Sequence, residues 1–206
     1  MVSIPVSPYC ELARWLLDRL GIPYKEDGHA PVFHVLAARR HGGGSVVPVL
    51  DTSDASLVDA RDVVNYYEAR CPKERRLYPE DARTRAETER LFNLFFDEFG
   101  VAVRAWAYAY LLPSNRAAGI RVWTSRAPLL ERLAVRLAYP LLVAATRSSL
   151  GLKPDTVTKQ RAVMDTILDQ VEARLADGRR YLMGERFTAA DLALAALAAP
   201  AVLPPE

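Results

Sequence analysis

The spacing of apolar and polar residues divides the chain into a mixed first part and a helical second part. Short β-branched runs in the first 70 residues predict strands at 2–6, 22–26, 46–50 and 55–57. Helical spacing between and after these runs predicts helices at 8–20, 32–40 and 59–70. The resulting order, β-α-β-α-β-β-α, is typical of a small α/β domain.

From residue 82 onward the apolar residues recur only at helical spacing. This predicts helices over 82–112, 115–150, 156–176 and 188–199. The polar, proline-containing stretch before them is typical of a linker. We therefore predict an α/β domain at 1–71, a linker at 72–81 and an all-helical domain at 82–206.

Prolines are expected to limit several of these elements. Pro5 and Pro48 lie inside predicted strands, where proline removes a hydrogen-bond donor and favours a strand end, an edge or a bulge. Pro113 is expected to end the first long helix, and Pro128 and Pro140 to break the next helical segment.

The helix over 8–20 begins at Ser7-Pro8-Tyr9-Cys10, where the sequence places its first candidate chemistry. Ser7 is a favourable N-cap, and Pro8 is favourable at the first helical position. The free amide N–H groups and the positive dipole end of that turn favour an anion such as a thiolate. Ser7 and Cys10 are therefore both candidates for thiol chemistry, Ser7 as a hydrogen-bond donor and Cys10 as a nucleophile.

Two later helix starts carry capping signals. Asp59 is expected to cap the helix over 59–70, with Asp62 three residues later. Thr188 and Asp191 form an acidic variant of the capping box, and we assign Asp191 a structural role.

Composition narrows the possible functions. Of the 206 residues half are hydrophobic, and the formal charge is only +2 with the arginines scattered, which does not favour nucleic-acid binding. Two cysteines and three dispersed histidines predict neither a disulfide framework nor a metal site. The most lipid-like run, 137–145, is shorter than the ~20 residues that a membrane span needs. With no signal-peptide pattern at the start, we expect a cytoplasmic protein without a membrane partner.

These motifs, in this order, resemble the cytosolic glutathione S-transferases. The resemblance rests on the Ser-Pro-Tyr-Cys turn, Val47-Pro48, Asp59, the Leu77-Tyr78-Pro79 linker and the Phe-Thr-Ala-Ala-Asp box that ends at Asp191. It implies a thioredoxin-like N-terminal domain, an all-helical C-terminal domain and a homodimer. It also implies detoxification chemistry, in which the thiolate of glutathione attacks a small apolar electrophile held by the helical domain.

The resemblance also assigns roles to individual residues. Ser7 would contact the glutathione sulfur, and Tyr9 would either line the site or only pack. Val47, before a cis Pro48, would pair with the cysteinyl part of glutathione through its backbone. The γ-glutamyl end would be held at Asp59 and Ala60.

Two departures from the family pattern keep alternatives open. Ala60 stands where the family has a serine, and the basic contact for the glycine carboxylate has no clear match, with Arg40 as a candidate beside Arg39 and His41. The first alternative is a glutathione-dependent thiol reductase that uses Cys10. The second is a catalytically silent, transferase-like binding module.

Overall fold

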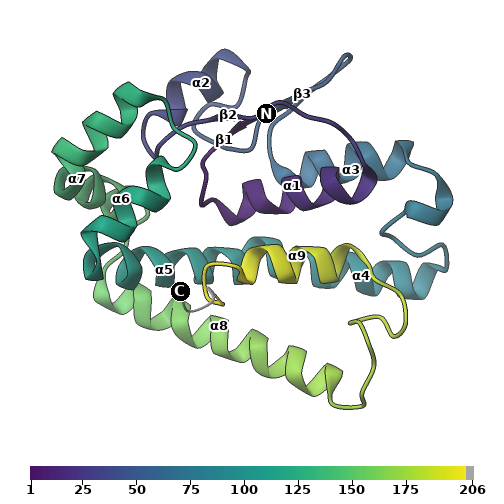
Figure 1. The fold of residues 1–206 in the computed structure, drawn as a ribbon. Helices are drawn as coiled ribbons and strands as arrows, with labels where there is room; N and C mark the ends of the chain where they lie inside the picture. Colours follow the sequence, from purple (N-terminus) through teal and green to yellow (C-terminus); the bar gives the residue numbers. More distant parts are fainter. Residues whose placement is uncertain (203–206) are drawn as a thin grey trace.

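The fold was analysed in a computed structural model that describes residues 1–202, without the side chains of residues 111–113. Figure 1 shows the arrangement of the helices and strands. The first part of the chain has the predicted order of elements: β1 (Val2–Ser3), α1 (Pro8–Leu20), β2 (Asp27–Gly28), α2 (His34–Arg40), β3 (Leu50–Asp51), β4 (Ser56–Leu57) and α3 (Ala60–Arg70).

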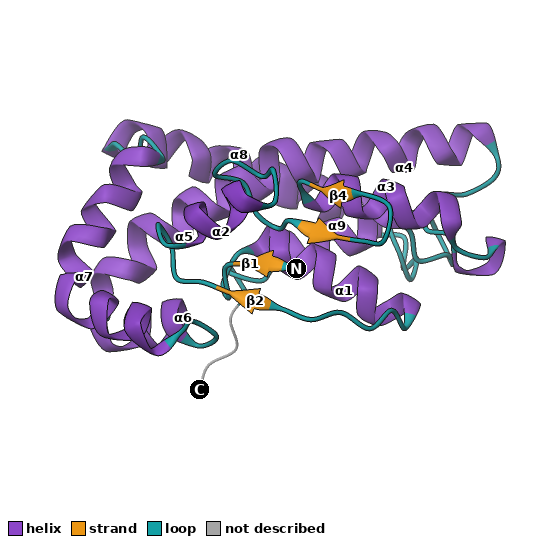
Figure 2. Cartoon of the chain, turned by 90° about the horizontal axis from the view of Figure 1, so that it is seen from above, coloured by secondary structure: helices purple, strands orange, loops and turns teal. Residues whose placement is uncertain are grey.

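The strands form two short pairs joined by one bridge (Figure 2). β1 pairs parallel with β2, and β3 pairs antiparallel with β4. The bridge joins Val2 to Val49 through two backbone hydrogen bonds of 2.8 and 3.1 Å. The thioredoxin-like part is thus a small sheet with α1 and α3 packed against each other beside it.

Three of the predicted strands were wrong in extent. The strand predicted over 2–6 ends at Ser3, and the strand predicted over 22–26 lies instead at Asp27–Gly28. The strand predicted over 46–50 is reduced to the Val49 bridge and β3. Each predicted run contains a proline, which lacks the N–H group that strand pairing needs.

The second part is helical throughout its regular structure. After the short η1 (Lys73–Arg75) come α4 (Ala82–Leu94), the π-helical turn η2 (Phe95–Phe99), α5 (Gly100–Ser114), α6 (Arg116–Thr124), α7 (Leu129–Ser149), α8 (Pro154–Leu175) and α9 (Ala189–Ala198). The capping box of α9 is formed as predicted: the Thr188 side chain accepts from the backbone N–H of Asp191, and the Asp191 carboxylate accepts from the N–H of Thr188 at 2.8 Å.

Two prolines limit the helices of the second part, one of them one residue later than predicted. α5 extends one residue past Pro113, to Ser114. The break predicted at Pro140 is confirmed as a kink: the backbone of Ala138 is not helical, with φ −105° and ψ 15°, and two helical segments of α7 meet there. A proline cannot donate to the carbonyl four residues earlier, that of Arg136, and a guanidinium N–H of Arg116 donates to it instead at 2.8 Å.

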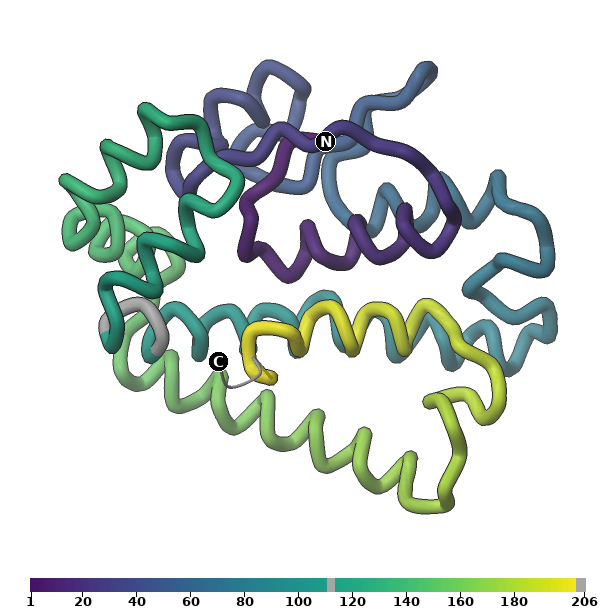
Figure 3. Tube along the Cα trace, viewed as in Figure 1, coloured from purple at the N-terminus to yellow at the C-terminus, as the bar shows by residue number. Residues whose placement is uncertain are grey.

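The main core lies where α9 packs between α1 and the long α4–η2–α5 segment (Figures 1 and 3). Apolar side chains from all of these helices meet there, including Leu12, Leu17, Phe92, Phe95, Phe99, Leu192 and Leu197. A smaller cluster, centred on Trp123, Val135 and Tyr139, holds α6 and α7 together at one end of the molecule. Among the helices described, none is long and apolar enough to cross a bilayer.

Candidate functional site

Ser7 is the N-cap of α1, as the sequence predicts. Its hydroxyl oxygen accepts a hydrogen bond from the backbone N–H of Cys10 at 3.3 Å. The hydroxyl hydrogen can be donated to a sulfur acceptor, as its hydrogen bond with the neighbouring Cys10 thiol shows, and the Ser7 side chain is half-buried rather than covered. Ser7 thus offers a donor beside the positive end of α1, an arrangement suited to a bound anion.

Cys10 lies on the inner side of the same turn. The residue is fully buried, and its burial raises the pKa of the thiol despite the nearby Ser7 hydroxyl. A buried thiol with a raised pKa is a poor nucleophile. These surroundings favour a packing role for Cys10 over the attacking role that the sequence left open.

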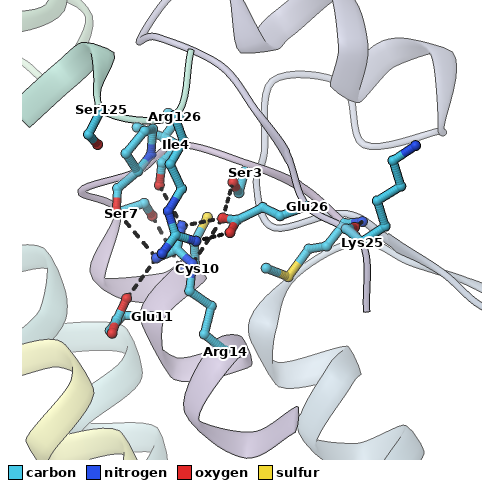
Figure 4. A network of polar contacts seen from close by, with 12 residues as sticks. Ser3, Ile4, Ser7, Cys10, Glu11, Arg14, Lys25, Glu26, Ser125 and Arg126 are labelled. Carbon is cyan, nitrogen blue, oxygen red and sulfur yellow. Dashed lines mark hydrogen bonds and ion pairs between the residues drawn. The ribbon is translucent and has the colours of Figure 1, made fainter. Parts of the chain in front are cut away.

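Arg14 anchors the segment that leads into this turn (Figure 4). The guanidinium is 4% exposed and lies 2.6 Å from Glu26 and 2.7 Å from Glu11. It also donates to the backbone carbonyls of Ile4 and Pro5, each at 3.3 Å. The chain just before Ser7 is therefore held to α1 by a guanidinium whose charge is fully compensated.

The half-buried carboxylate of Glu26 completes this network. It accepts a hydrogen bond from Ser3 at 2.6 Å and also pairs with Arg126, which belongs to the loop between α6 and α7. Burial alone would raise the pKa of Glu26. The hydrogen bonds from Arg14 and Ser3 lower it by more than burial raises it, so the pKa lies below its ordinary value. The N-terminal end of α1 is thus tied both to the sheet and to the helical part.

Tyr9 and Arg61 bring the starts of α1 and α3 together at one aromatic side chain. The Tyr9 hydroxyl donates to the carbonyl oxygen of Phe96 at 2.9 Å, and the two rings meet edge to face. From α3, the Arg61 guanidinium lies 4.4 Å from the centre of the Phe96 ring and 2.6 Å from Asp97. The Tyr9 hydroxyl is already engaged and burial raises its pKa, which favours a packing role over a polar contact with a ligand.

The N-terminus of α3 holds the candidates Asp59 and Ala60. Asp59 is the N-cap, and its carboxylate accepts from the N–H of Asp62 at 3.0 Å, as predicted. Ala60 is completely buried, so its side chain offers nothing to a ligand. At this end of α3 only backbone N–H groups and the Asp59 carboxylate remain for ligand binding.

The loop between α2 and β3 holds the other candidates. The Val47–Pro48 peptide bond is cis, Pro48 is buried and Val47 is half-buried. Arg40 is exposed in the last turn of α2, and among the described residues it forms no ion pair. The neighbouring His41, in contrast, is already paired with Asp51.

An apolar cavity of about 430 Å³ opens beside Ser7. Its walls come from the segment before α1, from α5, from α6 and from the end of α9, and include Pro5, Val6, Ala107, Tyr108, Ala118, Gly119, Val122 and Trp123. Two charged residues, Glu11 and Arg104, also line it. Glu11 is neutralised by Arg14, whereas the Arg104 guanidinium lies 5.6 Å from the centre of the Tyr9 ring.

The sequence interpretation did not single out most residues of this cavity. Tyr108 of α5 lines the cavity together with Trp123 of α6, and burial raises the pKa of Tyr108 to about 12. Arg104 and Gly119 were missed because their spacing is that of ordinary helical residues. Only the packing of α5 and α6 near the start of α1 brings them to Ser7.

Comparison with known families and structures agrees with this fold. A profile described as "Glutathione S-transferase, N-terminal domain" matches residues 1–75, and one described as "Glutathione S-transferase, C-terminal domain" matches residues 154–205. No curated protein sequence matches the chain.

Solved structures resemble the chain over nearly its whole length. A glutathione S-transferase from Sinorhizobium meliloti is 21% identical with a TM-score of 0.66, over 97% of this chain and 76% of that one. A glutathione S-transferase from Methylobacterium radiotolerans, in complex with glutathione sulfonate, is 18% identical with a TM-score of 0.65, over the same shares of the two chains. FzlA from C. crescentus is 20% identical with a TM-score of 0.63, again over 97% and 76%.

The two matched profiles together cover more than half of the chain and belong to one family. The chain is a member of the glutathione S-transferase family, with a thioredoxin-like N-terminal domain and a helical C-terminal domain. Among the residues that the structure describes, no group of histidine, cysteine and acidic side chains is arranged to hold a metal ion.

Proposed function

We propose that this protein is a glutathione transferase that activates the thiol of glutathione at Ser7 and holds a small apolar electrophile in the cavity between α5 and α6. Membership of the family supports glutathione-dependent transfer in general. The observation that carries the more specific proposal is the position of Ser7, a half-buried hydroxyl at a helix N-terminus that also lines the large apolar cavity.

The magnitudes are sufficient for thiol activation. A free thiol has a pKa of about 8.5, and lowering it by ~2 units requires about 2.7 kcal/mol of preferential stabilisation of the thiolate. A hydrogen bond from Ser7 to the anion supplies about 1.5–3 kcal/mol, and the N-terminus of α1 about 0.3–1 kcal/mol more. The positive charge of Arg104, which lines the same cavity, acts in the same direction.

The chemistry then follows from these surroundings. The thiol proton passes to solvent, and the thiolate forms a carbon–sulfur bond with the electrophile. The displaced group leaves with the electron pair of the bond that breaks. The apolar walls hold the acceptor next to the sulfur and keep water from the reacting atoms.

The glutathione tripeptide itself would be bound by groups of the N-terminal domain. We assign the cysteinyl part to the backbone at Val47 and the γ-glutamyl part to Asp59 and the free N–H groups at the start of α3. Arg40, which is exposed in the last turn of α2, is the candidate cation for the glycine carboxylate. A cytoplasmic location and a homodimer are further parts of this proposal.

The test compares Ser7 variants in conjugation of glutathione to an activated aryl chloride. Ser7→Gly removes the hydroxyl but retains a residue that is well tolerated at an N-cap. We expect kcat/KM to fall about 10- to 100-fold, because the loss of a charged hydrogen bond costs about 1.5–3 kcal/mol. The thiolate absorbance of bound glutathione should shift to higher pH by a corresponding amount.

Ser148→Ala, which changes an exposed serine on α7, is the matched control and should leave both values unchanged. If Ser7→Gly conjugates glutathione as fast as the wild type while Cys10→Ala loses activity, the thiol reductase would be the better interpretation. Failure of the wild-type protein to bind glutathione at millimolar concentration would instead favour a catalytically silent binding module. The alanine at position 60, whose buried side chain cannot donate to a ligand, is the observation that favours this second candidate.

A further inference from the structure

The outward side of α7 is unusually apolar for an exposed helix. Five leucines point away from the core with exposed fractions between 55% and 81%: Leu129, Leu130, Leu133, Leu137 and Leu141. We call these residues the leucine face. Their separations of three and four residues place them along one side of the helix. The opposite side of α7 is independently buried, with Val135 and Tyr139 in the cluster around Trp123.

The leucine face lies at one end of the molecule, away from the main core. In Figures 1 and 2, α7 occupies that end in both views, and α6 lies next to it. Single exposed leucines are common, but a contiguous exposed apolar patch marks a surface that binds something. The face is separate from the cavity, since no leucine of this face lines the cavity beside Ser7.

The surroundings of the leucine face are strongly basic. Residues 115–150 contain six arginines and one glutamate, a surplus of five positive charges in a chain whose formal charge is only +2. The glutamate, Glu131, is turned inward and binds His29 and the N–H of Ala30. Five of the six arginines are exposed. Arg126 is paired with Glu26, whereas Arg136 lies within α7 between the leucines. The partner should therefore be anionic.

We propose that the leucine face and its arginines bind the surface of a membrane rich in anionic phospholipids. Exposed leucines on a helix with flanking arginines are the features by which an amphipathic helix lies in a bilayer interface. The expectation of no membrane partner rested on the absence of a run long enough to span a bilayer, and interfacial binding requires no span.

Two other occupants, a second copy of this chain and a different protein, fit the surface less well. A second copy of the chain would bring its own arginines against these, with no exposed acidic residue between 115 and 150 to compensate them. Protein interfaces draw most of their binding energy from tryptophan, tyrosine and arginine anchors, and leucine is under-represented among them. Here the exposed apolar residues are leucines, while Trp123 and Tyr139 are buried beneath them.

The experiment is co-sedimentation of the full chain with two kinds of vesicles, one of phosphatidylglycerol and phosphatidylcholine in equal parts, the other of phosphatidylcholine alone. We expect binding to the first and much weaker binding to the second, with a loss at high salt because the contact is partly electrostatic. Equal binding to both vesicles, or binding to neither, would overturn the proposal.

Variants assign the binding to this face. Leu133→Ser combined with Leu137→Ser should weaken binding at least about tenfold, since two buried leucine contacts are lost. Arg136→Gln should weaken it about fivefold. Leu168→Ser and Arg83→Gln are the matched controls, on α8 and α4, and should bind as the wild type does.

The replaced leucines are exposed, so thermal unfolding of the double variant should match that of the wild type. Unchanged vesicle binding in a folded double variant would overturn the proposal. A concentration-dependent dimer that is abolished by the double variant, without any vesicle binding, would replace it by self-association. Because none of these measurements uses glutathione, the proposal does not depend on the transferase activity.

Discussion

At the scale of single residues, the hydroxyl of Ser7 and the thiol of Cys10 lie in the same turn of α1 but differ in how deeply they are buried. The N-terminus of a helix stabilises a thiolate by about 0.3–1 kcal/mol, or up to ~2 kcal/mol in favourable geometry. Cys10 has no exposed surface, and the cost of burying its charge exceeds this gain, so the pKa of the thiol is raised. Ser7 keeps contact with the cavity because it lies one turn earlier, at the cap itself.

This difference predicts the pattern of cysteine labelling. In the native protein, iodoacetamide should modify the half-buried Cys71 at neutral pH, while Cys10 should stay unmodified until the chain unfolds. Burial also raises the pKa of Cys71, so its labelling should be slower than that of a free cysteine and should accelerate as pH rises. Peptide mass spectrometry with and without denaturant provides the measurement. Rapid native labelling of Cys10 would show that its thiol is reachable and would revive the reductase alternative.

At the scale of secondary-structure elements, the π-helical turn η2 positions the groups that join α1 to α3. Its residues Phe96 and Asp97 receive Tyr9 from α1 and Arg61 from α3. The helix continues at Gly100, where the chain passes close to Tyr9. A Cβ atom added at Gly100 would lie 2.8 Å from the Tyr9 hydroxyl oxygen and 3.1 Å from a Leu197 methyl group.

Gly100→Ala should therefore destabilise the protein although alanine is the better helix former. We expect a net loss of about 1–2 kcal/mol in the free energy of unfolding, because the cost of overpacking exceeds the ~1 kcal/mol gained in helix propensity. Tyr9→Phe removes the oxygen that the new methyl group would strike. In a double-mutant cycle measured by urea unfolding, Gly100→Ala should thus cost less in the Tyr9→Phe background. Additive effects of the two substitutions would contradict the close contact.

The same elements show why the sequence predicts helices better than strands. The helices over 8–20 and 59–70 contain their own caps, Ser7 and Asp59, and enough turns for the apolar spacing to be clear. The strands are pairs of two residues whose existence depends on partners far along the chain, such as Val49 for Val2. A prediction from local propensity therefore makes the strands too long, because it does not include the pairing that each proline prevents.

Some residues of the candidate site could likewise be predicted from local sequence, whereas others could not. Ser7 and Asp59 could be predicted because capping is a local feature of the sequence. The fold could be predicted from the order of several motifs. Arg14 and Arg104 could not be assigned, because their roles depend on Glu26 and on the cavity, which are formed by distant segments. The exposure of the leucines in α7 was also hidden, since helical spacing indicates an apolar side but not whether another element covers it.

At the scale of the whole molecule, the α6–α7 pair is joined to the N-terminal domain by polar contacts at β2. The carboxylate of Glu131 lies 2.6 Å from His29 Nδ1 and accepts from the N–H of Ala30 at 2.8 Å. Arg126 pairs with the half-buried Glu26, and a Cβ atom added at Gly28 would lie 2.8 Å from the Cβ of Arg126. The α6 helix that these contacts hold against the N-terminal domain also forms one wall of the cavity beside Ser7.

The link between His29 and Glu131 should make this contact depend on pH. Burial lowers the pKa of His29, but the hydrogen bond to Glu131 and the Asp27 carboxylate 3.3 Å away outweigh that effect, so the pKa is raised above its ordinary value of about 6.5. A group whose pKa rises on folding stabilises the folded state fully below its unfolded pKa, and this stabilisation is lost as pH rises through the folded pKa. The difference in unfolding free energy between the wild type and His29→Gln should therefore be largest in mildly acidic solution and should shrink as pH increases.

Urea unfolding over a pH series measures this difference. His34→Gln provides the control, since burial lowers the pKa of His34 and its contribution to stability should change with pH in the opposite direction. A difference for His29→Gln that stays constant, or grows with pH, would mean that His29 is not held in its charged form by Glu131.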